Sequence, residues 1–110
     1  MQVGDRVFGY SEGRWGAHAQ YLTILEDGPV ATMPTNVAFE LAAPSTEASH
    51  YAMASIRKAK IGSGQKVLVN GATGAIGSAA VQLLKTMGVN VTAVCDTPIS
   101  SWSRAWAPTA

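Results

Sequence analysis

Apolar and polar positions alternate in short runs over the first third of the chain, and this pattern predicts β structure. Runs rich in β-branched and aromatic residues cover residues 6–10, 19–25 and 30–33, with a turn at 26–29. A brief helix is expected over residues 37–42. This part of the chain is therefore expected to be mainly β.

From Ser45 the apolar residues recur at helical spacing. Residues 44–47 form a helix start signal in which a hydroxyl side chain is available as the cap. The helix is expected to continue to Lys60 and to end before the Gly-Ser-Gly segment at 62–64.

Residues 66–70 form a short, continuous apolar run, which is typical of a strand buried on both faces of a parallel sheet. A glycine-rich turn follows at 71–77, and apolar residues then recur at helical spacing until Gly88, which sits where a left-handed C-cap belongs. Residues 89–95 are expected to form a second strand. Strand, turn, helix and strand within about thirty residues predict a βαβ unit and an α/β fold class.

The glycine-rich turn has the chemistry of a diphosphate site. A Cβ at the positions nearest to a phosphate would keep it from the main-chain amides, and a following helix directs its free N–H groups and positive dipole end at the ligand. The pattern Ala72-x-Gly74-x-x-Gly77 approaches the dinucleotide fingerprint, with an additional Gly71 before it. We assign the diphosphate to Gly74, Ala75, Ile76 and Gly77, with Thr73 as a possible side-chain contact. Ala72 is counted among the cofactor-binding residues of the same turn.

Other uses of this turn are weighed against that assignment. A glycine turn can serve only to pack a strand tightly against a helix, and this alternative stays open. A Walker A loop is excluded because Ser78 and Ala79, and no lysine, follow Gly77. Asp96 lies 19 positions after Gly77, where an acidic residue contacts the ribose of NAD, but it can equally be a solvated aspartate one position out of register.

Composition excludes several function classes. The chain has 110 residues, 47% hydrophobic and 14% charged, with a formal net charge of +1, which is globular and gives no electrostatic case for nucleic acid or a membrane surface. The cations Arg57, Lys58, Lys60 and Lys66 cluster around a helix end and are interpreted as a solvated surface.

Targeting and metal-binding signals are also absent from the sequence. Its beginning lacks the apolar stretch of a signal peptide, and no run approaches the roughly 18 apolar residues of a membrane span. With Cys95 as the single cysteine, we expect no internal disulfide, no Cys-rich zinc site and a reducing, cytoplasmic compartment. His18 and His50 are isolated, and no metal site is predicted.

The sequence resembles the medium-chain dehydrogenase/reductase family, in its zinc-independent, quinone-oxidoreductase-like branch. The segments that carry the resemblance are residues 3–7, 16–21, 41–43, 58–60, 64–77 and 79–83. The resemblance implies that residues 1–44 are the C-terminal part of a GroES-like β-barrel domain and that residues 45–97 begin a Rossmann NAD(P)-binding domain. Both domains are then truncated, because family chains are about three times longer than this one.

The activity implied by the resemblance is hydride transfer from a nicotinamide nucleotide to an enone, quinone or other carbonyl compound. The cofactor is NADP or NAD, with NADPH slightly favoured. Tyr51 matches a family position near the nicotinamide, and a packed core tyrosine is the alternative. Glu47 stands where zinc-dependent relatives carry a cysteine ligand, which disfavours zinc. No catalytic residue is assigned.

The chain itself is expected to be a homo-oligomer that binds the cofactor weakly and turns over little or not at all. A non-catalytic fragment or nucleotide-binding module is therefore a second interpretation. A third is an extended short-chain dehydrogenase, which can share the Gly-Ala-Thr-Gly-x-Ile-Gly turn. About seventy residues precede the turn here, and the Tyr-x-x-x-Lys pair of that family is absent.

The last residues, 98–110, fit no part of the family pattern and are interpreted as an aberrant tail. Because tryptophan has one codon, the overlapping reading frame from Ala105 can encode Leu-Gly-Ala-Asp-Arg, and family members commonly carry Leu-Gly-Ala-Asp at about this place. We predict that a frameshift near residues 96–101 produced this tail; gene sequencing would test the prediction.

Overall fold

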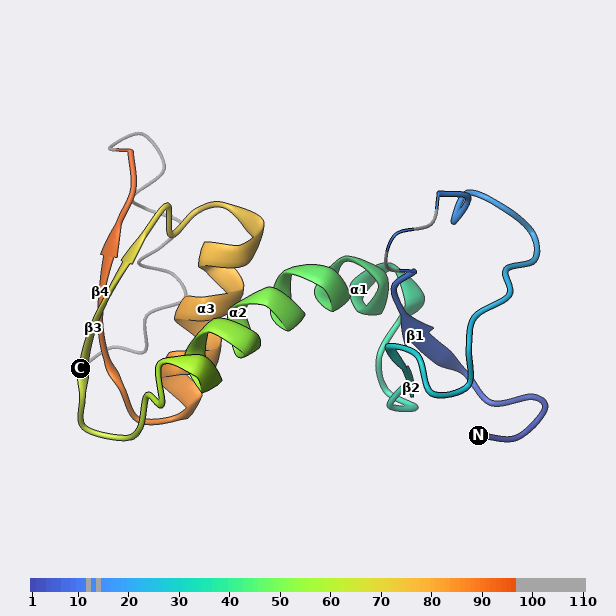
Figure 1. Ribbon diagram of the computed structural model, residues 1–110, viewed down its shortest axis with the longest axis horizontal. Coiled ribbons are helices and arrows are strands. Elements are labelled where there is room, and N and C mark those ends of the chain that lie inside the picture. The colour runs from blue at the N-terminus through green and yellow to red at the C-terminus, as the bar shows by residue number, and fades with distance from the viewer. Residues whose placement is uncertain (12, 14, 97–110) are drawn as a thin grey trace. The chain divides into compact units, whose positions relative to one another are not determined.

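The computed structural model describes residues 1–11, 13 and 15–96, and it divides the chain into two units, Met1–Glu47 and Ala48–Ala110 (Figure 1). The interpretation of residues 98–110 as an aberrant tail, with its frameshift, falls outside the described residues.

Antiparallel pairing forms the sheet of the first unit. Strand β1 (Val7–Gly9) pairs with β2 (Val30–Thr32) in a register that sets Val7 against Thr32. Helix α1 (Phe39–Ala42) follows and continues into a 3-10 turn, η1 (Ala43–Ser45). These elements confirm two predicted strands and the predicted short helix, each within two residues of the expected bounds.

The predicted strand at 19–25 is wrong, because this segment adopts no regular structure. The side chains of Tyr21 and Leu25 are 90% and 73% exposed. A strand is stable only when its backbone groups pair with a neighbour, and in the described part of the chain β1 and β2 pair only with each other. The composition of residues 19–25 is suited to a strand, but among the described residues no neighbouring strand pairs with this segment.

The side chain of Arg6, just before β1, forms hydrogen bonds with the segment that precedes α1. Its guanidinium donates to the carbonyl oxygens of Val37 at 2.9 Å and of Thr35 at 3.2 Å. The same group lies over the ring of Phe39, 4.5 Å from the ring centroid, in a cation–π contact. One side chain therefore links the sheet of the first unit to its helix.

The predicted hydroxyl cap at the start of the long helix is also wrong. Helix α2 spans Thr46–Lys58, and the hydroxyls of Ser45 and Thr46 donate to the carbonyl oxygens of Ala42 and Ala43 instead of accepting from N–H groups. The reason is that α1 and η1 run into α2 with helical backbone angles, so α2 begins on a preceding turn and not from extended chain.

A parallel βαβ unit forms the second unit, as predicted. Strand β3 (Lys66–Asn70), helix α3 (Ala75–Thr86) and strand β4 (Asn90–Val94) follow in order. The strands pair in parallel, with Lys66 opposite Asn90 and Asn70 opposite Val94. Figure 1 shows α2 and α3 on the same side of this sheet.

The core of the second unit is built at the C-terminal ends of its two helices. Val89 donates its N–H to Leu84 at 3.0 Å, and Gly88 holds the left-handed φ of +73° that the sequence predicts. Helix α2 ends in the same Schellman arrangement, with Ile61 donating to Ile56 at 3.2 Å. These four apolar side chains, Ile56, Ile61, Leu84 and Val89, meet in one hydrophobic cluster.

The position that closes α2 is a lysine where glycine is usual. Lys60 has a φ of +52° and donates its N–H to Arg57 at 3.0 Å. A side chain in this region carries a steric cost that glycine avoids. The sequence-based end of the helix at Lys60 is therefore two residues late, because Lys60 terminates the helix and does not extend it.

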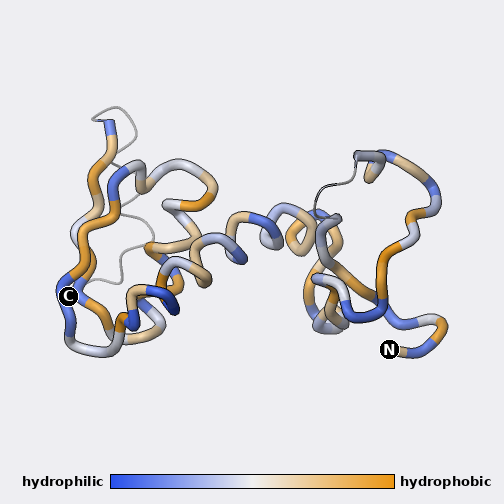
Figure 2. Tube along the Cα trace, viewed as in Figure 1, coloured by the Kyte–Doolittle hydropathy of each residue, from blue (hydrophilic) through white to orange (hydrophobic). Residues whose placement is uncertain are grey.

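Only one face of the β3–β4 sheet is covered within the described residues. Val67 and Val69 pack toward the cluster, whereas Leu68 between them is 65% exposed. The apolar run at 66–70, typical of a strand buried on both faces, is therefore covered on only one face among the described residues, as expected for a sheet of two strands. Figure 2 shows both strands as predominantly hydrophobic, which is the composition of strands that are covered on two sides.

Candidate functional site

The glycine-rich turn joins the carboxyl end of β3 to the N-terminus of α3. Gly71 adopts a left-handed φ of +71°, and its carbonyl oxygen accepts the N–H of Gly74 at 3.0 Å. Ala72 donates its N–H to the carbonyl oxygen of Val94 at 3.1 Å. The turn is therefore held against the end of β4, at the edge of the sheet where both parallel strands finish.

Gly77 lies against the backbone of this turn. A Cβ on Gly77 would overlap the carbonyl group of Gly71 and would come within 3.0 Å of the Cα of Ala72. No side chain fits at this position without moving the backbone. The first turn of α3 therefore packs directly against the backbone of the turn that follows β3, whereas the sequence predicted close packing against the strand itself.

The first turn of α3 presents unpaired main-chain donors. Within the described part of the chain, the N–H groups of Ala75, Ile76 and Gly77 have no hydrogen-bond partner; the helix ladder begins with Ser78, which donates to Gly74 at 2.8 Å. Gly74 is the N-cap, makes no side-chain cap bond, and is followed by no acidic residue in the first turn. Three donors and the positive end of the helix dipole thus stay available to an anion.

Gly74 has no side chain that would block access to these N–H groups. Its backbone is extended, with φ −71° and ψ 165°, so any residue could adopt its conformation. A Cβ there would have only the carbonyl oxygen of Gly71 within 4 Å, at 3.4 Å. Glycine is therefore not required by the fold at this position. A cradle that a Cβ would partly fill, beside unpaired amides, fits the diphosphate of a dinucleotide.

Two predicted site residues support the turn from behind. Ala72 is 1% exposed and its N–H is engaged by Val94, so it offers no donor to a ligand. Gly74 likewise has its N–H engaged by Gly71. Thr73 is partly exposed, and its hydroxyl has no partner among the described residues.

Sequence reasoning underestimated Gly71. The alignment of Ala72 with the first fingerprint position made Gly71 an extra residue, whereas its left-handed backbone and its carbonyl oxygen organise the turn. The signal was present as glycines 71, 74 and 77 at a regular spacing of three. With this spacing, Gly71 forms the tight turn, Gly74 leaves space in front of the main-chain amides, and Gly77 allows the close packing.

Asp96 and Tyr51 lie outside the turn. Asp96 is exposed and comes two residues after the end of β4, on the carboxyl side of the strands. Tyr51 lies on α2, is 42% exposed and has its ring 5.6 Å from that of His50 in an edge-on contact. Among the described residues no hydrogen bond joins either side chain to the turn, so their roles stay predictions.

The described residues show neither a metal cluster nor a helix that could cross a bilayer. No group of three or more His, Cys, Asp and Glu side chains gathers where it could hold a metal ion in these ranges. Every helix among the same residues is too short or too polar to span a membrane. Glu47, aligned with a zinc ligand of relatives, lies exposed in the first turn of α2.

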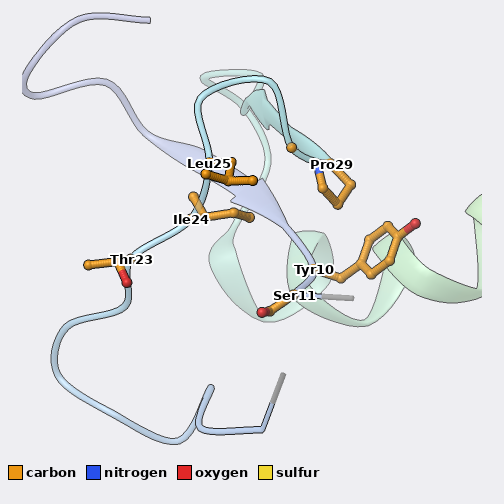
Figure 3. A pocket seen from close by; sticks show the side chains of 7 residues that line it. Tyr10, Ser11, Thr23, Ile24, Leu25 and Pro29 are labelled. Carbon is orange, nitrogen blue, oxygen red and sulfur yellow. The ribbon is translucent and has the colours of Figure 1, made fainter. Parts of the chain in front are cut away.

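The first unit has a hollow of about 300 Å³ beside β1. Figure 3 shows Ile24 and Leu25 together over this strand, with Tyr10 and Ser11 near its end. Its volume is at the lower limit for small-molecule pockets, and its lining offers hydroxyl groups and apolar side chains. Residues 23–25, from the segment predicted as a strand, line the hollow without forming one.

Comparison with known proteins gives a consistent set of relatives. Trans-enoyl reductase pgmF of Aspergillus terreus is 29% identical over 100 residues, which cover 89% of this chain and 28% of that protein. The CurK enoyl reductase structure matches with a TM-score of 0.67 and 26% identity over 74% of this chain and 25% of that one.

A second solved structure is the quinone oxidoreductase from Thermus thermophilus, solved also in complex with NADPH. It matches with a TM-score of 0.64 and 31% identity over 70% of this chain and 26% of that one. No family model matches the sequence. The chain thus spans about a quarter of the length of each of these relatives. The resemblance identified from the sequence is confirmed.

Proposed function

Because the chain resembles quinone oxidoreductases and enoyl reductases of the medium-chain dehydrogenase/reductase superfamily, we propose that its glycine-rich turn binds the diphosphate of a nicotinamide nucleotide. The observation that carries this proposal is the set of three unpaired N–H groups at Ala75, Ile76 and Gly77. They lie at a helix N-terminus that has no side-chain cap, and the first turn of α3 contains no acidic residue to compete with a phosphate.

The remaining residues of the turn have supporting roles in this proposal. Gly71 sets the backbone so that the donors face one side, and Gly77 allows the helix to pack against β3. Gly74 leaves room for phosphate oxygens to reach the amides. The hydroxyl of Thr73, which has no partner among the described residues, can donate to the same phosphates.

The proposed reaction of the complete protein is reduction of an enone, quinone or related carbonyl compound. The bound nicotinamide supplies the hydride, whereas the residues of this chain bind and orient the nucleotide. The relatives' names, an enoyl reductase and a quinone oxidoreductase, support acceptors of this class. In this scheme Tyr51 lies near the nicotinamide, residues 1–44 contribute part of a GroES-like substrate domain, and residues 45–97 begin the nucleotide-binding domain.

NADPH is the proposed cofactor, with NADH as the alternative. The quinone oxidoreductase from Thermus thermophilus forms a complex with NADPH, and this likeness supports NADPH. Asp96 supports NADH, because a carboxylate near the ribose would accept hydrogen bonds from its hydroxyls and repel a phosphate there. The two nucleotides therefore need to be compared directly.

A non-catalytic nucleotide-binding module is the second candidate function for this chain. It is favoured by the open face of the β3–β4 sheet, where Leu68 is 65% exposed, because a half-covered sheet holds a cofactor less rigidly. An assay of NADPH oxidation with an enone or quinone acceptor separates the two candidates. Turnover above the acceptor-only and protein-only controls supports the reductase, and nucleotide binding without turnover supports the module.

The central test is calorimetric titration of the 110-residue chain with NADPH and NADH. Gly74→Val should reduce affinity by at least about tenfold, because its side chain would occupy the approach to the amides while the extended backbone accommodates it. Gly62→Ala is the matched control, since a Cβ there meets nothing within 4 Å. Equal nucleotide binding by the Gly74 variant and the parent chain would refute the site.

A further inference from the structure

The net charge of the chain is near neutral because its two halves carry opposite charges that nearly cancel. Residues 1–47 carry six carboxylates and two guanidiniums, a formal charge of −4. Residues 48–96 carry five cations and one carboxylate, a formal charge of +4. The division falls at the boundary between the two structural units. Interactions with charged partners therefore depend on each unit and not on the total of +1.

The five cations among residues 48–96 gather at one end of the second unit. They lie in the last turns of both helices, in the segment after α2 and at the start of β3: Arg57, Lys58, Lys60, Lys66 and Lys85. Gly64 donates to Gly88 at 2.9 Å and Asn90 donates to Gln65 at 2.8 Å, so the segment before β3 is bonded to the segment after α3. We call this set of five side chains the basic edge.

Figure 1 shows the ends of α2 and α3 beside the start of β3, at the opposite end of the sheet from the glycine-rich turn. Figure 2 shows the end of α2 among the most hydrophilic parts of the unit. The basic edge is therefore separate from the proposed nucleotide site. A parallel strand of five residues, about 3.3 Å per residue, lies between them.

Nothing described in the second unit neutralises the basic edge. None of its five side chains forms an ion pair among the described residues, and Asp96 lies beyond the other end of β4. Each helix C-terminus contributes about half a negative charge, so the two dipoles together offset about one of the five. A surplus of about four positive charges stays at this end, where Lys85 is half-buried and the other four side chains are exposed.

The first unit offers the complementary surface. Its densest negative position is the turn before β2, where Glu26 and Asp27 are adjacent and exposed. We call these two residues the acidic turn. Neither side chain has a hydrogen bond or an ion pair within the described part of the chain. The carboxylates are therefore available to a partner without first breaking a contact.

We propose that the basic edge of one copy of this chain docks the acidic turn of a second copy. The chain supplies both complementary charges in surplus, so pairing between copies neutralises both. Such a contact is heterologous, because different surfaces of the two copies meet. Since charges are screened beyond about 8 Å at physiological ionic strength, the contact is close and strongly dependent on salt.

Sedimentation velocity of the chain at low and high ionic strength is the first test. We expect association at about 0.01 M salt and dissociation at about 1 M, where the Debye length falls from about 30 Å to about 3 Å. Association that persists or strengthens at high salt would overturn the proposal. It would point instead to apolar contact through the open sheet face around Leu68.

Charge exchange between two variants tests the specific pairing. The double variant Lys58→Glu/Lys60→Glu reverses part of the basic edge, and Glu26→Lys/Asp27→Lys reverses the acidic turn. Each variant alone should be monomeric at low salt. An equimolar mixture should associate, because each variant then meets a complementary surface on the other. Circular dichroism and thermal unfolding of each variant verify that it is folded.

A matched control distinguishes the effect of the acidic turn on association from the effect of the net charge of the first unit. Glu40→Lys/Glu47→Lys changes the charge of the first unit by the same amount away from the turn, and it should retain association. Loss of association in this control equal to that in the turn variant would overturn the assignment. So would a monomeric parent chain whose basic edge binds only an added polyanion, because the occupant would then be a foreign acidic molecule.

Discussion

The Cα of Gly77 faces the carbonyl group of Gly71, and a methyl group on Gly77 would overlap that carbonyl. The two glycines are six residues apart, yet they form one close contact between the turn and the helix. This contact brings the N–H groups of α3 up to the end of β3. The geometry of the proposed nucleotide site therefore depends on the absence of a single carbon atom.

Replacing Gly77 by alanine should destabilise the fold by roughly 1–3 kcal/mol, because the backbone must shift to accommodate the added carbon. Urea unfolding followed by circular dichroism measures the change in the free energy of unfolding. Gly62→Ala serves as the control, since space is available there and the change should be neutral or stabilising by about 0.4–1 kcal/mol. If both variants unfold at the same urea concentration, the close contact is not a feature of the protein in solution.

Replacing Lys60 by glycine should stabilise the chain. The steric cost of a side chain at a φ of +52° is about 1–2 kcal/mol, and the additional backbone entropy of glycine offsets about 0.5–1 kcal/mol of the gain. A net increase of about 0.5–1 kcal/mol in the free energy of unfolding is expected. The midpoint of thermal unfolding measures it, at a salt concentration that screens the lost charge.

Two controls accompany this variant. Lys60→Ala removes the same charge but keeps a Cβ, so it should not reproduce the gain. Lys58→Gly places glycine inside the last turn of α2, where it should cost roughly 1 kcal/mol. Stabilisation by alanine as large as by glycine would show that charge, and not backbone conformation, sets the effect.

Leu84 and Leu68 allow burial to be compared within one residue type. Leu84 is 1% exposed in the cluster beneath the sheet, whereas Leu68 is 65% exposed on the other face. Leu84→Ala should therefore cost about 2–5 kcal/mol, and Leu68→Ala less than about 1 kcal/mol. Urea midpoints of the two variants measured side by side test this difference. A large cost at Leu68 would mean that its face is covered in solution.

The sequence predicts the second unit far better than the first, and the reason is the range of the interactions that decide each. Strand β3 and helix α3 are specified by apolar runs and glycines within a few residues of each other, so their bounds could be predicted closely. The segment 19–25 has the composition of a strand, but a strand also needs a neighbour, and local pattern does not reveal whether one is present.

Backbone conformation at single residues limits the prediction of the site as well. Gly88 could be predicted as left-handed because glycine is the usual residue there, whereas Lys60 has the same geometry with no signal in its residue type. The sequence alone does not decide whether Gly71 or Ala72 is the first fingerprint position, because the two are neighbours and both are small. Hydrogen bonds from Gly74 and Ala72 distinguish them, and these bonds exist only in the folded chain.

Asp96 provides a test of nucleotide choice that rests on the proposed function. In the folded chain it is exposed just after β4, at the edge of the sheet to which Ala72 attaches the turn. If its carboxylate faces the ribose, Asp96→Ser should improve NADPH binding relative to NADH by about tenfold, which is about 1.4 kcal/mol. Two unit charges 4 Å apart near a protein surface interact by roughly 4 kcal/mol. The expected change of about 1.4 kcal/mol is smaller because solvent screens the exposed carboxylate of Asp96.

Calorimetric titration of both nucleotides into the parent chain and Asp96→Ser gives the ratio directly. Asp27→Ser is a suitable control, because it removes an exposed carboxylate that belongs to the first unit and not to the βαβ unit. Asp96 lies two residues beyond the end of β4, where strand alternation no longer fixes the direction of its carboxylate. An unchanged ratio with both nucleotides still bound would therefore assign Asp96 to the solvent-facing side, and it would leave the choice between NADPH and NADH to residues other than this carboxylate.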